Sequence, residues 1–425
     1  MNMIRSKIQA YLYMGYVPPN TFPGWLDDCF EQVSAGYRYD AADVSRLLDT
    51  VMDDSCARVS GTGYCIVPIS GGWDSRIILG ALLQRFEAGR IKTLTFGVPG
   101  QLDFEIGREV SRAMNVEHSA FDLSTLEISW DVLLESVRES PWTYVPDTFY
   151  NRMSIRRIAS ADDTVFTGFL GGALTGSHFS KAVTQEQAKA AFIKKQRRGM
   201  KLNAAGYAPA KIISPLPVGS AISYGELFEL GIRQARCIAP IVTPQKQWVQ
   251  WGCDFGKIPS LGADVIAPFA SPEWAAYWLR APKKAKHGQQ LYRAMMKHKF
   301  PRLAAMRGKH ILGVKPSSVA RFWFEKNRFR VQKRIDAMIP RLKFGSRILH
   351  NYLDFASAFR EREDFQLILQ KAYNFLVQTE VVPWLNLEKL KAEHMSFKAN
   401  HEASFLLLIG LALNLQAENA GKQLS

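Results

Sequence analysis

The residues best suited to bind or transform a ligand form the run SGGWDS at positions 70–75. This run lies between a short apolar segment and a segment with helical spacing. Its two adjacent glycines let the backbone curl around an anion, and the N–H groups of such a turn point into the concavity. The Ser70 and Ser75 hydroxyls add donors for phosphate oxygens. Asp74 would repel phosphate unless Mg²⁺ lies between them, so the run predicts a site for a magnesium-bound phosphate.

Two other common phosphate-binding turns are excluded at this position. No Gly-Lys-Ser/Thr follows the glycines, as a Walker A loop requires, and the G-x-G-x-x-G spacing of dinucleotide turns is absent. The alternative to a phosphate site is a purely structural strand-to-helix turn in which Asp74 caps the helix.

The segments around this run determine how it is positioned. Apolar runs alternate with stretches of helical spacing, which favours an α/β fold with a parallel sheet and helices on both faces. The predicted strands are Tyr64–Ile69, Ile91–Val98, His118–Leu123 and Thr164–Gly168, and the predicted helices are Ile77–Phe86, Asp103–Met114 and Leu126–Val137. Ligands of open parallel sheets bind at the carboxyl ends of strands, which places the chemistry at the turns near Ser70, Gly97 and Gly168.

The remainder of the chain is expected to be mostly helical from Gln185 onward. Proline-rich breaks occur at 209–217, 240–244 and 259–272, and the tail at 354–418 has helical spacing throughout. Its most apolar stretch, Phe405–Leu413, has about half the ~18 residues needed to span a bilayer and is expected to be a core helix.

Composition restricts the class of protein. The 425 residues are 47% apolar and 22% charged, as in ordinary globular proteins. No apolar h-region follows the basic residues near Met1, and none of the five cysteines forms a C-x-x-C pair, which argues against a secretory signal, a zinc ribbon and a disulfide framework. We therefore expect a cytoplasmic protein without a membrane span.

Positive charge is concentrated in one part of the chain. The 54 Lys and Arg residues outnumber 39 acids, and the stretch Arg280–Arg347 holds twenty cations against only Glu325 and Asp336. Such a block could bind nucleic acid, anionic lipid or a phosphate-bearing substrate, or could simply be a solvated basic face. No RNA- or DNA-binding signature accompanies it, so nucleic acid is the less expected partner.

The SGGWDS run after a strand resembles the PP-loop of the ATP pyrophosphatases. Within that superfamily the chain is similar to the synthetase domain of asparagine synthetases and their relatives, which include β-lactam synthetase and lasso-peptide cyclases. The similar segments occur in the same order along nearly the whole chain: 15–19 (GYVPP), 96–100 (FGVPG) with Asp103, 109–110, 117–118, 167–177, 267–269 (APF), 306–309 (MRGK) and 385–415.

The resemblance implies an adenine nucleotide α-hydrolase-like fold with ATP and Mg²⁺ bound. It implies a helical lead-in at 1–55 and a PP-loop domain at 56–345, with a nucleotide core at 60–185 and a helical part at 186–345. A helical extension at 346–425 would pack on that domain.

The resemblance also implies roles for individual residues. Pyrophosphate and Mg²⁺ would be held by Ser70, Gly71, Gly72, Asp74 and Ser75, with Asp74 as the metal ligand, and the AMP moiety by Pro68, Phe96 and Gly168. Asp103 falls on a carboxylate at the mouth of the site, and Lys309 on a lysine that stabilises charge on the reacting phosphate. A fixed cation suits that step, because phosphates separate in it. The alternatives are that Lys309 is a surface residue of the basic stretch and that Asp103 caps its helix.

The chain departs from the family pattern in two ways. It reaches the synthetase region by residue 15 without an amidotransferase domain, so we expect its nitrogen to come from free ammonia, a separate glutaminase or an amine on the substrate. Phe169 and Gly172 stand where the family has a glutamate and a metal-binding aspartate. His178, close to this loop, is the best spare acid or base among the histidines.

The leading hypothesis is an ATP-dependent ligase that adenylates a carboxylate, releases pyrophosphate, and transfers ammonia or an amine to form an amide. The basic half suits an anionic substrate such as a sugar acid on a carrier. One alternative is a catalytically weakened relative with a nucleotide-binding or regulatory role. A second, an RNA-modifying PP-loop enzyme, is disfavoured because no suitable cysteine arrangement is present.

Overall fold

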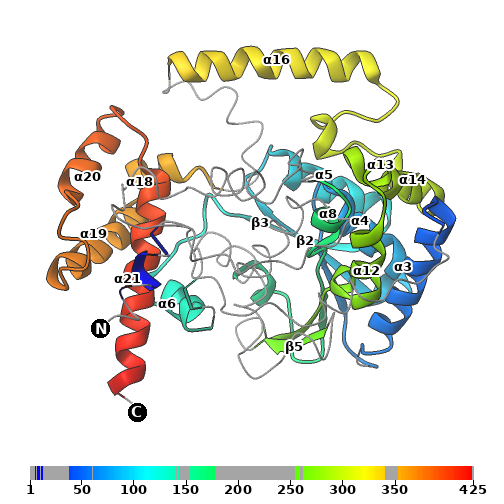
Figure 1. Cartoon of the computed structure of the whole chain (residues 1–425), viewed down its shortest axis with the longest axis horizontal. Helices are drawn as coiled ribbons and strands as arrows, with labels where there is room; N and C mark the ends of the chain where they lie inside the picture. Colours follow the sequence, from blue (N-terminus) through cyan, green and yellow to red (C-terminus); the bar gives the residue numbers. More distant parts are fainter. Residues whose placement is uncertain are drawn as a thin grey trace.

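A computed structural model shows the arrangement of the chain (Figure 1). It describes residues 5, 7–9, 11–12, 38–59, 61–139, 141–142, 153–177, 254–258, 262–339 and 353–423. His178 and the proline-rich breaks at 209–217 and 240–244 lie outside these residues.

The centre of the fold is a six-stranded sheet in the order β3-β2-β1-β4-β6-β5. Neighbouring strands are parallel from β3 to β6, and β5 pairs antiparallel with β6 at the edge. The strands are β1 Cys65–Pro68, β2 Ile91–Gly97, β3 Glu117–Asp122, β4 Thr164–Phe166, β5 Asp254–Ile258 and β6 Ala263–Ile266. The four predicted strands are confirmed, and the fold is α/β with β1 near the middle of the sheet.

The two strands beyond β4 were not predicted. The expectation that the chain is mostly helical from Gln185 onward, with a break at 259–272, is wrong for β5 and β6. β6 is only four residues long, and Asp264 interrupts its apolar pattern, so nothing local distinguishes it from a loop. It becomes a strand because its backbone pairs with β4, from Thr164↔Asp264 to Phe166↔Ile266.

The helices range from four residues in α8, α13 and α15 to 22 residues in α21. Their bounds are α3 Ala41–Cys56, α4 Trp73–Leu82, α5 Leu102–Ala113, α6 Trp130–Glu139, α8 Gly171–Leu174, α12 Pro272–Arg280, α13 Lys283–Lys286, α14 Gln290–Lys299, α15 Pro301–Ala304, α16 Val319–Met338, α18 Phe355–Glu361, α19 Glu363–Gln378, α20 Leu387–Met395 and α21 Glu402–Gln423. Short 3₁₀ turns lie at Ala88–Arg90, Pro268–Ala270, His287–Gln289 and Lys309–Ile311. None of the described helices is long and apolar enough to cross a membrane.

Small residues let helices approach their neighbours closely beside β1 and β2. A Cβ on Gly107 of α5 would lie 2.3 Å from the Thr95 hydroxyl, and one on Gly80 of α4 would lie 2.7 Å from the Phe300 ring. α4 is therefore enclosed, and nine of its ten residues are buried.

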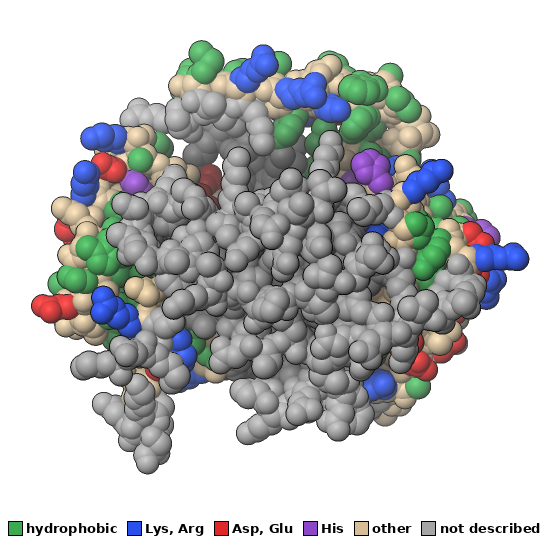
Figure 2. Space-filling model, viewed as in Figure 1, with side chains coloured by type: hydrophobic (Ala, Val, Ile, Leu, Met, Phe, Trp, Pro, Cys, Tyr) green, Lys and Arg blue, Asp and Glu red, His purple; other side chains and the backbone are tan. Residues whose placement is uncertain are grey.

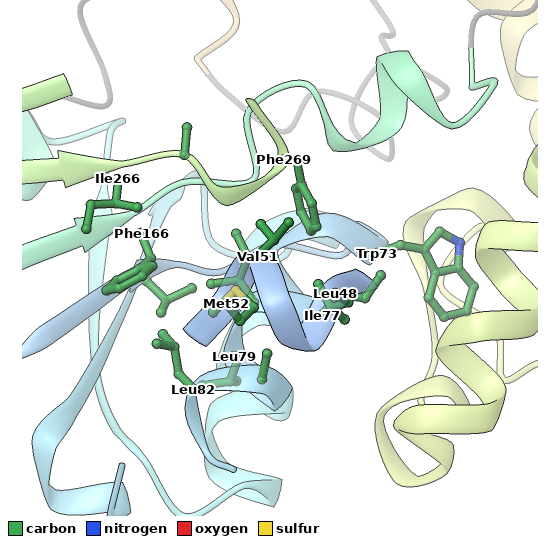
Figure 3. Packing of buried hydrophobic residues seen from close by; sticks show 14 of the residues in the cluster. Leu48, Val51, Met52, Trp73, Ile77, Leu79, Leu82, Phe166, Ile266 and Phe269 are labelled. Carbon is green, nitrogen blue, oxygen red and sulfur yellow. The ribbon is translucent and has the colours of Figure 1, made fainter. Parts of the chain in front are cut away.

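One hydrophobic core surrounds the sheet and its first helices. Residues of α3, α4 and β4 meet there with the β6 strand and the turn after it. Figure 3 shows ten of them: Leu48, Val51, Met52, Trp73, Ile77, Leu79, Leu82, Phe166, Ile266 and Phe269. The amphipathic α3, expected in the helical lead-in, thus packs on the sheet and its first helices.

A second core forms among the C-terminal helices (Figure 1). Its centre is the apolar stretch Phe405–Leu413 of α21, predicted as a core helix, in which every residue is buried. α6 contributes Trp130 and Leu134 to this core rather than to the sheet's core, although it lies within the range expected for the nucleotide domain. The expected domain boundaries stay predictions, but the cores do not divide at those residue numbers.

Candidate active site

The SGGWDS turn connects β1 to α4 at the carboxyl end of a central strand. Its two serines hold the turn in shape: the Ser70 N–H donates to Ser75 Oγ at 3.2 Å, and the Gly72 N–H donates to Ser70 Oγ at 3.2 Å. The two hydroxyl oxygens are 3.3 Å apart. A strand end, a tight turn and a helix start are therefore combined as the sequence predicts.

The N-terminus of α4 begins without a capping side chain. Its N-cap residue is Gly72, which has no side chain to accept the first helical N–H groups. The alternative in which Asp74 caps the helix is wrong, because its carboxylate bonds to other elements. An uncapped helix start carries partial positive charge and exposes N–H donors, which favours binding of an anion.

A pocket of about 390 Å³ opens at this helix start. It brings together four of the predicted site residues from three distant parts of the chain: Gly72, Asp74, Gly168 and Lys309. The other lining residues are Trp73, Phe169, Leu170, Gly172, Ser177, Gln289 and His310. Pro68 and Phe96, predicted near the AMP moiety, are not among the lining residues.

Asp74 is held from two sides. The Gly172 N–H donates to its Oδ2 at 2.9 Å, and the Tyr292 hydroxyl donates to its Oδ1 at 2.8 Å. Tyr292 is completely buried, and its ring packs edge-on against Phe269 and Trp278. Burial, followed by the charge of Asp74 and the hydrogen bond to it, raises the pKa of Tyr292 well above its ordinary value. The phenol therefore stays protonated and remains a donor.

Lys309 is tied to the turn through Asp103. Its Nζ donates to Asp103 Oδ2 at 2.7 Å, and the Gly71 N–H donates to Asp103 Oδ1 at 2.9 Å. The Lys309 backbone N–H also donates to the Gly71 carbonyl at 3.0 Å. The alternative that Asp103 caps its helix is wrong, because Asp103 binds Gly71 and Lys309 while α5 has Gln101 as its N-cap. Lys309 lines the pocket, and its side chain is 40% exposed.

Gly71 is required by the closeness of these neighbours. A Cβ at this position would lie 2.9 Å from the Lys309 Cβ and 3.0 Å from Asp103 Oδ1. A larger residue would push the lysine and the carboxylate away from the turn. The first glycine of the run therefore does more than permit a tight turn, because it allows the 309 segment to dock.

A buried guanidinium lies directly behind the turn. Arg76 is completely buried and donates to the carbonyls of Arg307 at 2.5 Å, Gly71 at 3.4 Å and Leu303 at 3.4 Å. Burial lowers its pKa to about 10, so it is still charged at neutral pH. Arg76 ties the 303–309 segment to the turn and adds a fixed positive charge beneath it. The sequence motif gave no indication of this role.

The loop after β4 packs on the carboxylate of Asp74. A Cβ on Gly168 would lie 2.8 Å from the Asp74 Cβ, and one on Gly171 would lie 2.7 Å from its Cγ. Leu170 between them adopts φ +66° and ψ −13°, a left-handed conformation that is costly for a leucine. The tight packing around Asp74 therefore imposes local strain on this loop.

Tyr292, Gln289 and His310 are site residues that the sequence analysis did not assign. The His310 ring lies 4.5 Å from the Trp73 ring. Although the residue is exposed, partial desolvation, with the nearby Arg293 and Arg76, lowers the pKa of His310. The ring is neutral at physiological pH. No motif marks any of the three, because tertiary packing of the 287–311 segment brings Gln289 and His310 to the pocket and Tyr292 to the buried side of Asp74.

The pocket offers few of the oxygen ligands that Mg²⁺ requires. Within the described residues no cluster of three or more His, Cys, Asp or Glu side chains could hold a metal ion. The pocket supplies one carboxylate, Asp74, and Gly172 contributes only backbone opposite it. This set fits a Mg²⁺ that arrives with a nucleotide and takes most of its ligands from phosphate and water.

No protein-family model matches the chain, and the comparison with curated proteins gave no match.

Proposed function

We propose that this chain is an ATP-dependent ligase that adenylates a carboxylate and then joins ammonia or an amine to it. The observation that carries the proposal is the meeting of Asp74 and Lys309 in one pocket at the uncapped start of α4. An uncapped helix start, a carboxylate for a nucleotide-borne metal and a cation together suit a polyphosphate better than a neutral ligand.

Each residue has a defined part in the proposed reaction. The α4 N-terminus and the Ser70–Ser75 turn bind the phosphates, and Asp74 would hold a Mg²⁺, which would neutralise part of their charge. The substrate carboxylate attacks the α-phosphate, which forms the acyl-adenylate and releases pyrophosphate. Lys309 stabilises the negative charge that develops on the phosphates as they separate. The amine then attacks the acyl carbon and AMP leaves.

The ion pair of Lys309 with Asp103 suggests how the lysine would respond to substrate. Its ammonium is already held beside the turn by a carboxylate that also accepts the Gly71 N–H. A bound phosphate would compete with Asp103 for both donors. Asp103 therefore keeps the lysine positioned before the nucleotide arrives, and exchange of partners would accompany binding.

The test is ATP–pyrophosphate exchange by the purified chain, screened against pools of sugar acids, amino acids and peptides. Exchange that needs one pool and Mg²⁺, and that disappears in Lys309→Met, would support adenylation. Glutamine should not replace ammonia as nitrogen donor, and glutamate release from glutamine by the pure chain would contradict this. If ammonia supports turnover and glutamine does not, the next step is to look for a separate glutaminase that supplies the ammonia.

A second candidate is a nucleotide-binding or regulatory protein without turnover. It is favoured by Gly172, which leaves Asp74 as the only carboxylate among the described residues that line the pocket, and by Asp103, which already occupies the Gly71 N–H. Calorimetry with MgATP separates the two: tight binding without exchange for any pool would move this candidate ahead.

An RNA-modifying enzyme with a reactive cysteine receives no support from the described cysteines. Burial raises the pKa of the Cys56 and Cys65 thiols to about 12. Both therefore stay protonated at neutral pH and are poor nucleophiles.

A further inference from the structure

α16 is a twenty-residue helix that begins ten residues after Lys309 and runs along one side of the molecule (Figure 1). None of the described side chains from Lys315 to Ile339 is buried. At 1.5 Å per residue the helix is about 30 Å long. Most helices in proteins are stabilised by packing an apolar face, so a long helix with no buried side chain calls for a binding partner.

The surface of α16 is unusually apolar for an exposed helix. Of the eleven large hydrophobic side chains that are exposed in the described part of the chain, six lie between 319 and 339: Val319, Trp323, Phe324, Val331, Met338 and Ile339. Phe324 and Met338 are 65% and 81% exposed. Helical spacing places Phe324, Val331 and Met338 along one stripe of the helix, together with Ala320 and Ile335.

The same helix is strongly basic. Its sequence contains six Lys and Arg residues and only two acids, Glu325 and Asp336. Lys326 lies with its Nζ 4.4 Å from the centre of the Trp323 ring. Figure 2 shows hydrophobic side chains and cations side by side along this helix. Cations and large apolar groups are therefore presented to the same partner.

We propose that α16 docks the protein onto the surface of an anionic lipid bilayer. Its apolar stripe would enter the boundary between headgroups and acyl chains, while its cations contact anionic headgroups and long Lys and Arg stems extend to reach them. A nucleic acid would satisfy the cations but leave Phe324, Val331 and Met338 in water. A second copy of this helix would bring like charges together. An anionic bilayer satisfies both the charges and the apolar stripe.

This inference is independent of the proposed function, because it concerns binding and requires no turnover. The docked helix would place the pocket near the membrane, since Lys309 and α16 are joined by the short 310–318 segment, in which Val314 pairs back to Gly308.

The test is co-sedimentation of the full chain with vesicles of phosphatidylcholine alone or with one quarter phosphatidylglycerol. We expect binding to the anionic vesicles only, weakened by salt. Lys326→Glu with Arg330→Glu should weaken it at least thirtyfold, since each cation near an anionic surface contributes a factor of about five. Phe324→Ser with Val331→Ser should weaken it by a further independent factor of about ten or more.

Matched controls come from exposed residues of the C-terminal helices. Leu367→Ser with Val377→Ser removes side chains that are 63% and 65% exposed on α19, and Lys389→Glu with Lys398→Glu reverses two exposed lysines. Both control variants should bind vesicles like the unaltered chain. Circular dichroism verifies that every variant is folded, and single substitutions replace any pair that is not.

Several results would overturn the proposal. These are absence of binding to anionic vesicles, equal loss in the control variants, or binding that the α16 substitutions leave unchanged. Retention of labelled RNA that depends on Lys326 and Arg330 but not on Phe324, without vesicle binding, would identify a nucleic acid as the occupant. A dimer in solution that Phe324→Ser dissociates, again without vesicle binding, would identify a second copy.

Discussion

The ammonium of Lys309 lies 2.7 Å from Asp103 Oδ2, although the two residues are separated by 206 positions in the chain. The other oxygen of the same carboxylate accepts the Gly71 N–H, so one aspartate connects the SGGWDS turn to the lysine. These two hydrogen bonds bring Gly71, Asp103 and Lys309, which are far apart in the sequence, together in one site. The first prediction tests it.

Lys309→Met should reduce turnover about a hundredfold or more, the loss typical of removing one electrostatic stabiliser from a transition state. Methionine keeps the apolar stem and removes only the cation. ATP affinity should change little, because the ammonium acts where charge develops. Single-turnover kinetics and calorimetry measure the two quantities, and a silent substitution would rule out a role in the chemical step.

Asp74→Ala should abolish ATP-dependent chemistry but should also destabilise the fold, because it leaves the buried Tyr292 hydroxyl without the acceptor that it has now. An unsatisfied buried donor costs about 1–3 kcal/mol. Asp74→Asn keeps an acceptor oxygen and should lose activity with a smaller drop in the free energy of unfolding. Equal stability of the two variants would contradict this.

Tyr292→Phe should weaken the affinity of the site for Mg²⁺ without removing the phosphate site. The hydroxyl orients Asp74 by a 2.8 Å bond but lies fully buried, behind the carboxylate. We expect the Mg²⁺ concentration for half-maximal exchange to rise, with kcat at saturating metal nearly restored. A merely structural role would lower the melting temperature and leave this concentration unchanged.

Gly172→Asp should tighten Mg²⁺-dependent pyrophosphate binding. A Cβ at this position would lie 3.3 Å from Asp74 Oδ2 and 3.2 Å from Ser177 Oγ, so the new carboxylate would stand beside the existing one. Two carboxylates repel without a cation and bind one better. Calorimetry with MgPPi measures the gain, and Gly172→Asn is the uncharged control. Equal affinity in both variants would contradict the metal role of Asp74.

His394 should make stability fall in mild acid. The ring is buried, its Nδ1 accepts the His401 N–H at 3.0 Å, and its Nε2 lies 3.0 Å from the Ala356 carbonyl. Burial lowers its pKa to about 4. Between pH 6.5 and 4 the unfolded ring is protonated and the folded ring is neutral, so unfolding takes up a proton. The contribution is complete above pH 6.5 and lost as pH falls toward 4.

Denaturation as a function of pH tests this sign. His394→Gln should have a free energy of unfolding that depends less on pH over this window, although its absolute stability is lower. A pH dependence identical to that of the unaltered chain would show that other groups cause it.

Much of the sheet could be predicted because its strands are marked locally. Cys65–Pro68, Ile91–Gly97 and Thr164–Phe166 are short apolar runs bounded by turns, and the helix after each of the first two has apolar spacing. β6 could not be predicted in the same way. Its four residues form a strand only because β4 offers an unpaired edge, which is a property of the assembled sheet.

The turn at 70–75 can be recognised in the sequence, because the requirement for glycine and for hydroxyl donors is local to that turn. Which residues face the turn depends on how distant segments pack. Lys309, Tyr292 and Gly172 are 234, 217 and 97 residues beyond Ser75, and no local spacing relates them to it. They meet because Arg76 and Asp103 use their buried hydrogen bonds to hold distant segments against the turn, and such bonds exist only once the core has packed.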